Sequence, residues 1–246
     1  MKIKPPVAFF MCLTLYIAFF LVISCIVTFQ SAMESAVLTQ TNIPYQYKDA
    51  VIIDPGHGGL DGGTVGISGT TEKELNLQVA EKLRHVMQLF GVPADMTRES
   101  DQMLGEGGDT IAQKKVSDMQ TRLAMINAKP YRLMMSIHMN HYPEEKYWGS
   151  QVFYAKKSEE AKAYGKAIQT SFRQFASPDN KREAKQASDE IYLLKHADCP
   201  ALIIECGFLS NSREEKLLQS DTHQIKLAAA IAAGYLSARP QLSSDP

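Results

Sequence analysis

Two spacings of apolar residues alternate along residues 51–239. Short apolar runs with the length and composition of buried strands occur at Val51–Asp54, Leu133–Ile137 and Ala201–Ile204. Between these runs, apolar residues recur every three or four positions, as they do on the buried face of a helix. The alternation predicts an α/β fold, a single domain in which a mostly parallel, twisted sheet is covered by helices on both faces.

The segment Leu75–Phe90 is the clearest predicted helix, and Gly91 and Pro93 end it. Its expected buried face comprises Leu75, Val79, Leu83, Val86 and Phe90. Further helices are expected at Met119–Ala128, Glu159–Phe175 and Thr222–Ser237, and further strands at Ala94–Thr97 and Gln151–Tyr154. Residues 99–117 contain three glycines and several charged side chains, so we expect a mobile loop there. The domain is expected to span residues 49–240, followed by a polar tail at 241–246.

The first 29 residues have the pattern of a membrane segment. Val7–Phe29 is a run of 23 residues without a charge, and a helix needs about 20 such residues to cross a bilayer core. Lys2 and Lys4 precede the run, so the positive-inside rule keeps the N-terminus in the cytoplasm and exports the rest. We therefore expect a signal or membrane anchor at residues 1–29, a polar linker at 30–48, and a domain on the outer face of the membrane.

The residues leave the processing of this segment open. The run is longer than the roughly 7–15 apolar residues of a signal peptide, and Ser31-Ala32-Met33 is a poor cleavage site. Both features favour a retained anchor. Cleavage stays an alternative, and so does lipid attachment at Cys25, which lies in a loose lipoprotein pattern.

Composition excludes several classes of protein. With 45% hydrophobic and 22% charged residues, the chain has the make-up of a globular protein. Its 26 basic and 27 acidic residues give a net charge of −1, which argues against a nucleic-acid partner. Cys199 and Cys206 flank the strand Ala201–Ile204, and seven extended residues span about 23 Å. A disulfide needs Cα atoms within about 7 Å, so both cysteines are expected to be free thiols.

Each of three predicted strands is followed by a residue that can bind a metal or act in catalysis. His57 follows the first strand, His138 follows the strand from Leu133, and Glu205 follows the strand from Ala201. The carboxyl ends of parallel strands meet at one edge of a sheet, where ligands bind. Imidazole and carboxylate groups brought together there would suit a catalytic zinc ion, which takes three protein ligands and leaves a fourth position for water. His141 lies beyond the strand end and is an alternative to His138.

A further ligand is expected from the start of the first helix, where Glu72 and Glu74 are both available. Thr71 and Glu74 have the spacing of a capping box, in which Glu74 would reach back to the backbone. That leaves Glu72 to point toward the sheet edge, so Glu72 is the predicted ligand. No His-Glu-x-x-His motif occurs, so the common zinc proteases are not supported.

Six motifs occur along the chain in a fixed order. They are Asp54-Pro55-Gly56-His57-Gly58-Gly59, Glu72-Lys73-x-Leu75-Asn76-Leu77, Thr97-Arg98, Arg122 with Ile126-Asn127, Ser136-Ile137-His138-x-Asn140, and Glu205-Cys206-Gly207-Phe208-Leu209-Ser210-Asn211. In this the chain resembles the zinc-dependent N-acetylmuramoyl-L-alanine amidases of bacterial cell-wall turnover, from Val51 to about Leu236. Within that family it is most similar to the germination-specific amidases of endospore formers, which act on spore cortex.

The resemblance implies a role for each matched position. Zn²⁺ would be held by His57, Glu72 and His138, Glu205 would be the catalytic residue, and Asn140 and Arg98 would contact the substrate. The substrate would be a peptidoglycan glycan strand with its stem peptide, in the cell wall or the cortex space. Hydrolysis would release L-alanine from N-acetylmuramic acid, as a step toward the muramic δ-lactam that a separate deacetylase helps to form.

Other functions remain open on the sequence. A zinc peptidase or a deacetylase acting on the same polymer would use the same ligands. A vegetative amidase, acting in wall turnover or cell separation, would share the fold and the reaction. A peptidoglycan-binding regulator without activity, or an enzyme whose metal site a partner protein activates or stabilises, are further alternatives.

Overall fold

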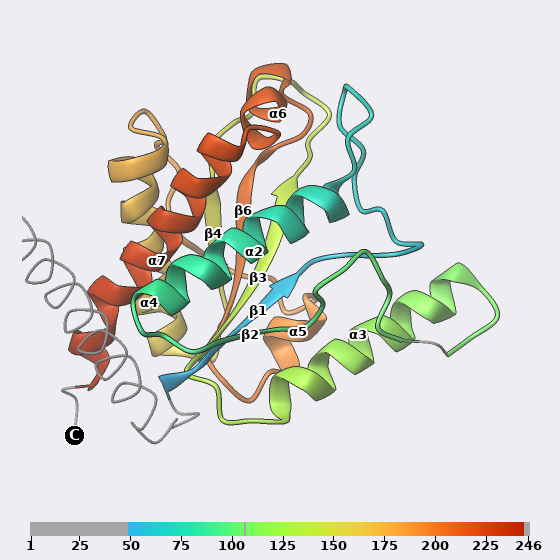
Figure 1. The fold of residues 1–246 in the computed structure, drawn as a ribbon, viewed down its shortest axis with the longest axis horizontal. Coiled ribbons are helices and arrows are strands. Elements are labelled where there is room, and N and C mark those ends of the chain that lie inside the picture. Colours follow the sequence, from blue (N-terminus) through green and yellow to red (C-terminus); the bar gives the residue numbers. More distant parts are fainter. Residues whose placement is uncertain (1–48, 106, 244–246) are drawn as a thin grey trace, which may run out of the picture. The chain divides into compact units, whose positions relative to one another are not determined.

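The computed structural model describes residues 49–105 and 107–243, which form a six-stranded sheet between two layers of helices (Figure 1). The strand order is β2-β1-β3-β6-β4-β5. The strands are β1 (Val51–Pro55), β2 (Ala94–Met96), β3 (Leu133–Asn140), β4 (Gln151–Tyr154), β5 (Lys185–Gln186) and β6 (Ala201–Phe208). β2, β1, β3 and β6 run parallel, whereas β4 is antiparallel to β6. The expected mostly parallel sheet is confirmed.

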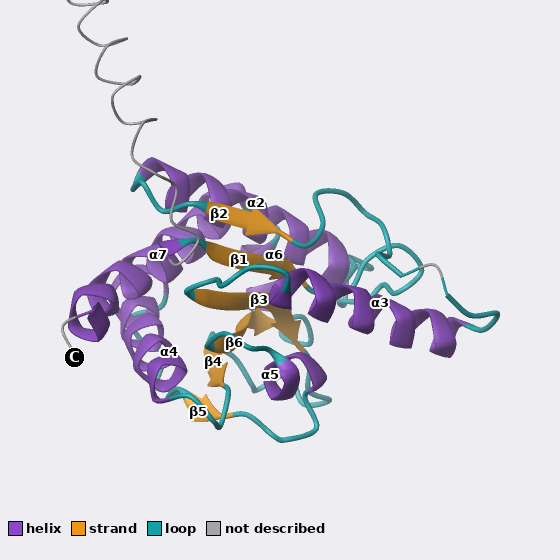
Figure 2. Cartoon of the chain, turned by 90° about the horizontal axis from the view of Figure 1, so that it is seen from below, coloured by secondary structure: helices purple, strands orange, loops and turns teal. Residues whose placement is uncertain are grey.

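Helices cover both faces of the sheet (Figure 2). They are α2 (Glu72–Leu89), α3 (Ile111–Asn127), α4 (Glu159–Ser171), the π-helix η2 (Phe172–Ala176), α5 (Tyr192–His196), α6 (Ser212–Leu218) and α7 (Asp221–Ser243). α2, α4 and α7 pack together on one face, and α3 and α5 lie on the other. α7 approaches α4 closely at Gly234, where a Cβ would lie 2.5 Å from the Cα of Ile168.

The core lies between the sheet and helices α2, α4 and α7. The side chains of Val51, Leu133 and Ala201, at the starts of β1, β3 and β6, are fully buried. The buried apolar side chains of α2 are Leu75, Val79, Ala80, Leu83 and Met87. The expectation for Phe90 is wrong, because α2 ends at Leu89 and Phe90 is 60% exposed at its C-cap. Met87 takes the inner position one turn after Leu83.

The expected mobile loop is shorter than the sequence indicates. Residues 111–117, assigned to that loop, form the first two turns of α3. A capping box starts the helix: Thr110 Oγ1 accepts a hydrogen bond from the Gln113 N–H, and Gln113 Oε1 accepts one from the Thr110 N–H. These two bonds satisfy N–H groups that a helix start leaves free. The polar composition of the segment hid this helix start.

The capping box expected at Thr71 and Glu74 is absent. Thr71 is the N-cap of α2, but its side chain accepts no capping hydrogen bond among the described residues. Glu74 is exposed on the outer side of the helix. The reasoning that separated Glu72 from Glu74 is therefore wrong, although the two residues do differ in position as described below.

The C-terminal helix is longer than expected. α7 continues to Ser243, so residues 241–243 of the expected polar tail are helical. The expected anchor at 1–29 and linker at 30–48 lie outside the described residues. Within residues 49–105 and 107–243, no helix has the length and apolar character required to span a membrane. Cys199 and Cys206 are free thiols, as expected.

Candidate metal centre and catalytic site

The carboxyl ends of β1, β3 and β6 bring the predicted residues to one edge of the sheet. His57 lies two residues after β1, His138 lies near the end of β3, and Glu205 lies in β6. His138 and Glu205 occupy paired positions on neighbouring strands. The register shifts between His138 and Asn140, a β-bulge of the kind that re-aims side chains beside active sites.

Three of the predicted residues form a compact ligand cluster. Glu72 Oε1 lies 3.3 Å from His57 Nε2 and 3.0 Å from His138 Nδ1. One ligand atom from each of the three residues lies within 4.8 Å of the others. A tetrahedral zinc ion with bonds of about 2.0–2.1 Å places its ligand atoms about 3.3 Å apart. The donor set and the spacing therefore fit zinc, and both imidazoles are partly exposed.

The Glu72 carboxylate is held in place before any metal binds. It is only 3% exposed, and Oε1 accepts hydrogen bonds from the Met139 N–H and the Asn76 amide. Oε2 accepts one from the Thr64 N–H at 2.9 Å. Burial alone would raise the pKa of Glu72, but hydrogen bonds with the two imidazoles hold the pKa well below its usual range.

His57 is oriented by a carboxylate that sequence reasoning missed. Asp61 Oδ2 lies 2.8 Å from His57 Nδ1, so Nδ1–H donates and Nε2 faces the cluster. Such carboxylate partners fix the tautomer and the ring plane of metal-binding histidines. Burial lowers the pKa of His57, but Asp61 and Glu72 outweigh it and raise the pKa to about 9. Only the spacing of Asp61, four residues after His57 in a glycine-rich turn, could have indicated this contact.

The backbone at His57 is strained and clamped. Its φ of 61° lies in the left-handed region, which non-glycine residues adopt at a cost and mainly at functional sites. Arg122 is 1% exposed and donates to the His57 carbonyl at 2.6 Å and the Pro55 carbonyl at 2.8 Å. Asp54 and Asp118 each accept a 2.6 Å hydrogen bond from the same guanidinium, which compensates its buried charge.

Arg98 also holds the backbone of the loop that carries His57. It is 1% exposed, and its guanidinium donates to the backbone carbonyls of Pro55, Gly56, Lys73 and Ser100. Four of its N–H donors are thereby used within the protein. This geometry argues against the substrate contact expected for Arg98, and its observed role is to hold the loop that carries His57.

Two glycines let backbone approach the ligands closely. A Cβ on Gly56 would lie 2.2 Å from His138 Cε1. A Cβ on Gly63 would lie 2.6 Å from Glu72 Oε2, and Gly63 also has a φ of 66°. Any larger residue at either position would displace a ligand side chain.

Glu205 has the environment of a proton acceptor. Its Oε2 is sealed from solvent and has no hydrogen-bond partner among the described residues. Desolvation raises the pKa of Glu205 to about 7, and the nearby Glu72 carboxylate adds to the rise, against an opposing effect of His138. A carboxylate with a pKa near neutrality can both accept and return a proton at physiological pH.

The remaining candidates lie at different distances from the cluster. Asn140 is half-buried beyond the bulge, and its side chain makes no hydrogen bond within the described part of the chain. It stays a candidate for substrate contact. His141 and Glu74 are both exposed, and neither is part of the ligand cluster.

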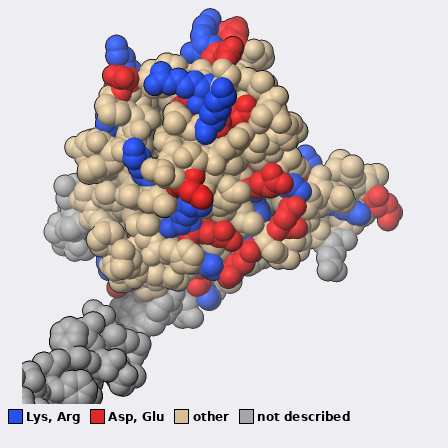
Figure 3. Space-filling model, turned by 45° about the horizontal axis from the view of Figure 1, so that its top comes forward, with Lys and Arg blue, Asp and Glu red and all other residues tan. Residues whose placement is uncertain are grey.

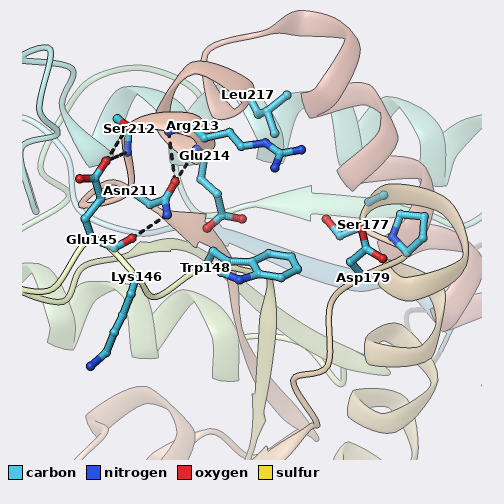
Figure 4. A pocket seen from close by; sticks show the side chains of 12 residues that line it. Glu145, Lys146, Trp148, Ser177, Asp179, Asn211, Ser212, Arg213, Glu214 and Leu217 are labelled. Carbon is cyan, nitrogen blue, oxygen red and sulfur yellow. Dashed lines mark hydrogen bonds between the residues drawn. The ribbon is translucent and has the colours of Figure 1, made fainter.

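The described surface is hollowed in several places, and one hollow borders the ligand cluster. A groove of about 400 Å³ borders His57 and His138 and is walled by α3 and α5, including Met119 and Tyr192. Another hollow of about 590 Å³ lies between α6 and the turn after η2, with Trp148 across it (Figure 4). On the face shown in Figure 3, acidic and basic side chains are interspersed.

Comparisons with known proteins agree with this geometry. The model of the N-acetylmuramoyl-L-alanine amidase family (Amidase_3) matches residues 51–236. The germination-specific N-acetylmuramoyl-L-alanine amidase of Bacillus subtilis is 39% identical over 187 residues, which are 76% of this chain and 78% of that protein. The amidase AmiA of Escherichia coli is 25% identical over 232 residues, 77% of this chain and 76% of that protein.

Solved structures give the same result. The CwlD amidase from Clostridioides difficile, determined in complex with the GerS lipoprotein, is 37% identical with a TM-score of 0.75, covering 80% of this chain and 100% of that one. An N-acetylmuramoyl-L-alanine amidase from Clostridium difficile 630 is 26% identical with a TM-score of 0.67, covering 80% and 100%. The family expected from the six motifs is confirmed.

Proposed function

Because the chain belongs to the N-acetylmuramoyl-L-alanine amidase family, we propose that it is a zinc enzyme that trims peptidoglycan of the spore cortex. The bond cleaved joins the lactyl group of N-acetylmuramic acid to the L-alanine of the stem peptide. Zn²⁺ would be held by His57, Glu72 and His138. The observation that carries this proposal is the convergence of three ligand atoms within 4.8 Å beside a carboxylate whose pKa is about 7.

The residues around the cluster have separate tasks in the reaction. Zinc bound there would lower the pKa of its water toward about 7 and polarise the scissile carbonyl. The Glu205 carboxylate accepts a proton from the attacking water as the water oxygen bonds to the carbonyl carbon. Glu205 then donates that proton to the nitrogen of L-alanine as the carbon–nitrogen bond breaks. Asp61 and Arg122 keep His57 in position throughout, and Asn140 contacts the substrate.

The spore role rests on the relative with a stated germination function. Its 39% identity over three quarters of this chain supports cortex peptidoglycan as the substrate and a role in germination. The freed lactyl carboxyl would then be available for δ-lactam formation with a separate deacetylase. We place the domain outside the membrane, in the cortex or wall space, with the N-terminal segment as its signal or anchor.

A protein partner is part of the proposal. The CwlD structure contains a lipoprotein bound to an amidase that is 37% identical to this chain. A partner of this kind would stabilise the metal site or activate the enzyme. His57 and His138 are partly exposed, so a bound partner would reach the ligand cluster from the solvent side.

The test is digestion of purified cortex and of vegetative peptidoglycan by the protein, with and without zinc, followed by mass spectrometry. We expect zinc-dependent release of stem peptides with a free L-alanine N-terminus, faster from cortex. Equal rates on both polymers would favour a vegetative amidase. Cleavage between two amino acids, or loss of acetyl groups alone, would contradict the proposed reaction and favour a peptidase or a deacetylase.

A further inference from the structure

A row of side chains crosses the sheet away from the metal ligands. His138 in β3 pairs with Glu205 in β6, and Glu205 pairs with Gln151 in β4. Residues at paired positions project from the same face of a sheet. The row continues to Arg182, whose Nη1 donates to Gln151 Oε1 at 2.6 Å. A guanidinium therefore ends a line that starts at a metal ligand and passes through the proposed catalytic carboxylate.

Arg182 is fixed in place but keeps unused donors. Its Nε donates to the Trp148 carbonyl at 2.8 Å, and its guanidinium carbon lies 4.5 Å from the centroid of the Phe208 ring. Its backbone N–H is bound by Asn180, whose side chain is 2% exposed. An arginine carries five N–H donors, and two are used here, so three have no partner among the described residues. Such a rigid fork matches a carboxylate.

Arg182 lies among charges of both signs: burial lowers the pKa of its guanidinium, and the carboxylates of Glu214 and Glu205 act in the opposite direction. Arg182 lines a hollow of about 680 Å³ whose ionisable side chains also include Lys146, Lys181 and Asp179. Within the described residues, no carboxylate lies within ion-pair distance of Arg182. Trp148, 43% exposed, lines this hollow and also the hollow of Figure 4, where it lies opposite α6.

We propose that Arg182 binds the free α-carboxylate of D-glutamate, the second residue of the stem peptide. This rests on the function proposed above. The sugars and the lactyl amide of the substrate are uncharged, whereas D-glutamate joins the next residue through its γ-carboxyl and leaves its α-carboxylate free. The stem peptide thus runs from the metal ligands across β6 and β4.

The distances agree with this direction. Two residues of extended chain span about 7 Å, and a hydrogen bond adds about 3 Å, which places the guanidinium about 10 Å from the scissile carbon. Neighbouring strands lie about 4.8 Å apart, so the backbones of His138 and Gln151, two strands apart, are separated by about 10 Å, and the Arg182 guanidinium lies against the Gln151 side chain. The sugar then lies over the groove at α3 and α5, where exposed Val116, Met119 and Tyr192 offer apolar contacts.

Two ligands that differ only in this carboxylate provide the test: N-acetylmuramoyl-L-alanyl-D-glutamate and its D-isoglutamine analogue. Trp148 is the chain's one tryptophan, so its fluorescence reports binding in a Glu205→Gln protein, in which turnover is slow. We expect the glutamate ligand to bind roughly tenfold to a hundredfold more tightly, the range of a charge-assisted hydrogen bond. In proteins with Glu205 intact, kcat/KM should follow the same order.

Arg182→Gln should remove this preference, and Arg182→Lys should retain part of it. Lys185→Gln, the loss of an exposed cation on β5 outside the hollow, should leave the preference unchanged. The ratio of two affinities on one preparation does not depend on how much of the protein is folded. Equal binding of both ligands by Glu205→Gln protein, or equal loss of both in the Arg182→Gln variant, would overturn the inference.

The same data separate this inference from the proposed function. Turnover of both ligands at equal kcat/KM would uphold the amidase and reject Arg182 as the carboxylate site. A carboxylate preference in binding, with cleavage of a different bond by zinc-loaded wild-type protein, would uphold the site and reject the proposed reaction.

Discussion

His138 and Glu205 lie at paired positions on two neighbouring parallel strands, β3 and β6. Their side chains therefore project from the same face of the sheet, one as part of the ligand cluster and the other with a carboxylate oxygen that has no partner among the described residues. This pairing places a proton acceptor one strand away from the metal position. It gives the two residues different roles, which substitutions can separate.

The first prediction separates the two neighbouring glutamates of α2. Glu72→Gln should lose zinc, because Glu72 Oε1 is the oxygen that both imidazoles face. Glu74→Gln should keep zinc and change the free energy of unfolding by no more than about 0.5 kcal/mol, as expected for an exposed site without a capping bond. Metal content after dialysis and a thermal melt measure both. Zinc loss in the Glu74→Gln variant would show that the glutamate assigned to the cluster is the wrong one.

The second prediction concerns Asp61. Asp61→Asn should weaken zinc binding about 10–100-fold, because the hydrogen bond that fixes the tautomer of His57 is altered. Lys115→Gln is the matched control, since Lys115 contacts Asp61 at Oδ1, away from the imidazole, and should have a smaller effect. Competition with a chromophoric chelator gives both affinities. Equal affinities for wild-type and Asp61→Asn protein would show that Asp61 does not support zinc binding through His57.

The third prediction is a pH dependence of the metal-free protein. The pKa of His57 is raised from 6.5 to about 9 in the fold. Protonated His57 therefore stabilises the metal-free fold fully below pH 6.5, and this stability is lost as the pH rises through 9. At 1.36 kcal/mol per pKa unit, the contribution is up to about 3 kcal/mol.

Thermal melts in EDTA between pH 6 and 9.5 check this. The melting temperature should fall across that range, and His57→Asn should flatten the curve. A melting temperature that rises with pH in the metal-free wild-type protein would contradict the hydrogen bonds assigned to His57.

The fourth prediction uses two glycines of the same loop. Gly56→Ala should lose zinc, because its Cβ would lie 2.2 Å from the His138 ring. Gly62→Ala is the control, since no atom lies within 4 Å of a Cβ at that position. Zinc content and far-ultraviolet circular dichroism of the two variants separate displacement of a ligand from global unfolding. Full zinc content in folded Gly56→Ala protein would show that the loop can relax around the ring.

The strand ends were predictable because three apolar runs are short and each is followed by a histidine or a glutamate. His57, His138 and Glu205 could therefore be placed at one edge from the pattern alone. Glu72 was also predicted, but through a capping box that does not form at Thr71. Its actual position depends on hydrogen bonds from Thr64 and Met139, residues that only the fold brings together.

Other features were missed because a local signal was masked by its surroundings or because they depend on contacts between separate segments. The start of α3 at Ile111 is set by a capping box within a stretch rich in glycine and charge. Arg98 was expected to contact the substrate. Its guanidinium instead donates hydrogen bonds to four backbone carbonyls of the protein, three of which lie far from it in the sequence. Arg182 reaches the row of site residues only because β4 pairs antiparallel with β6.

The fifth prediction tests the central claim, that Glu205 moves the proton while three other residues hold the metal. The measurement is zinc content and turnover of a muramoyl-peptide on the same preparation of Glu205→Gln, with Glu74→Gln as the matched control. The account predicts full zinc content and hydrolysis reduced about 10²–10⁴-fold, the usual size of a general acid–base contribution. Loss of zinc together with activity would make Glu205 a ligand, and activity within a few-fold of wild type would contradict its role as the proton acceptor.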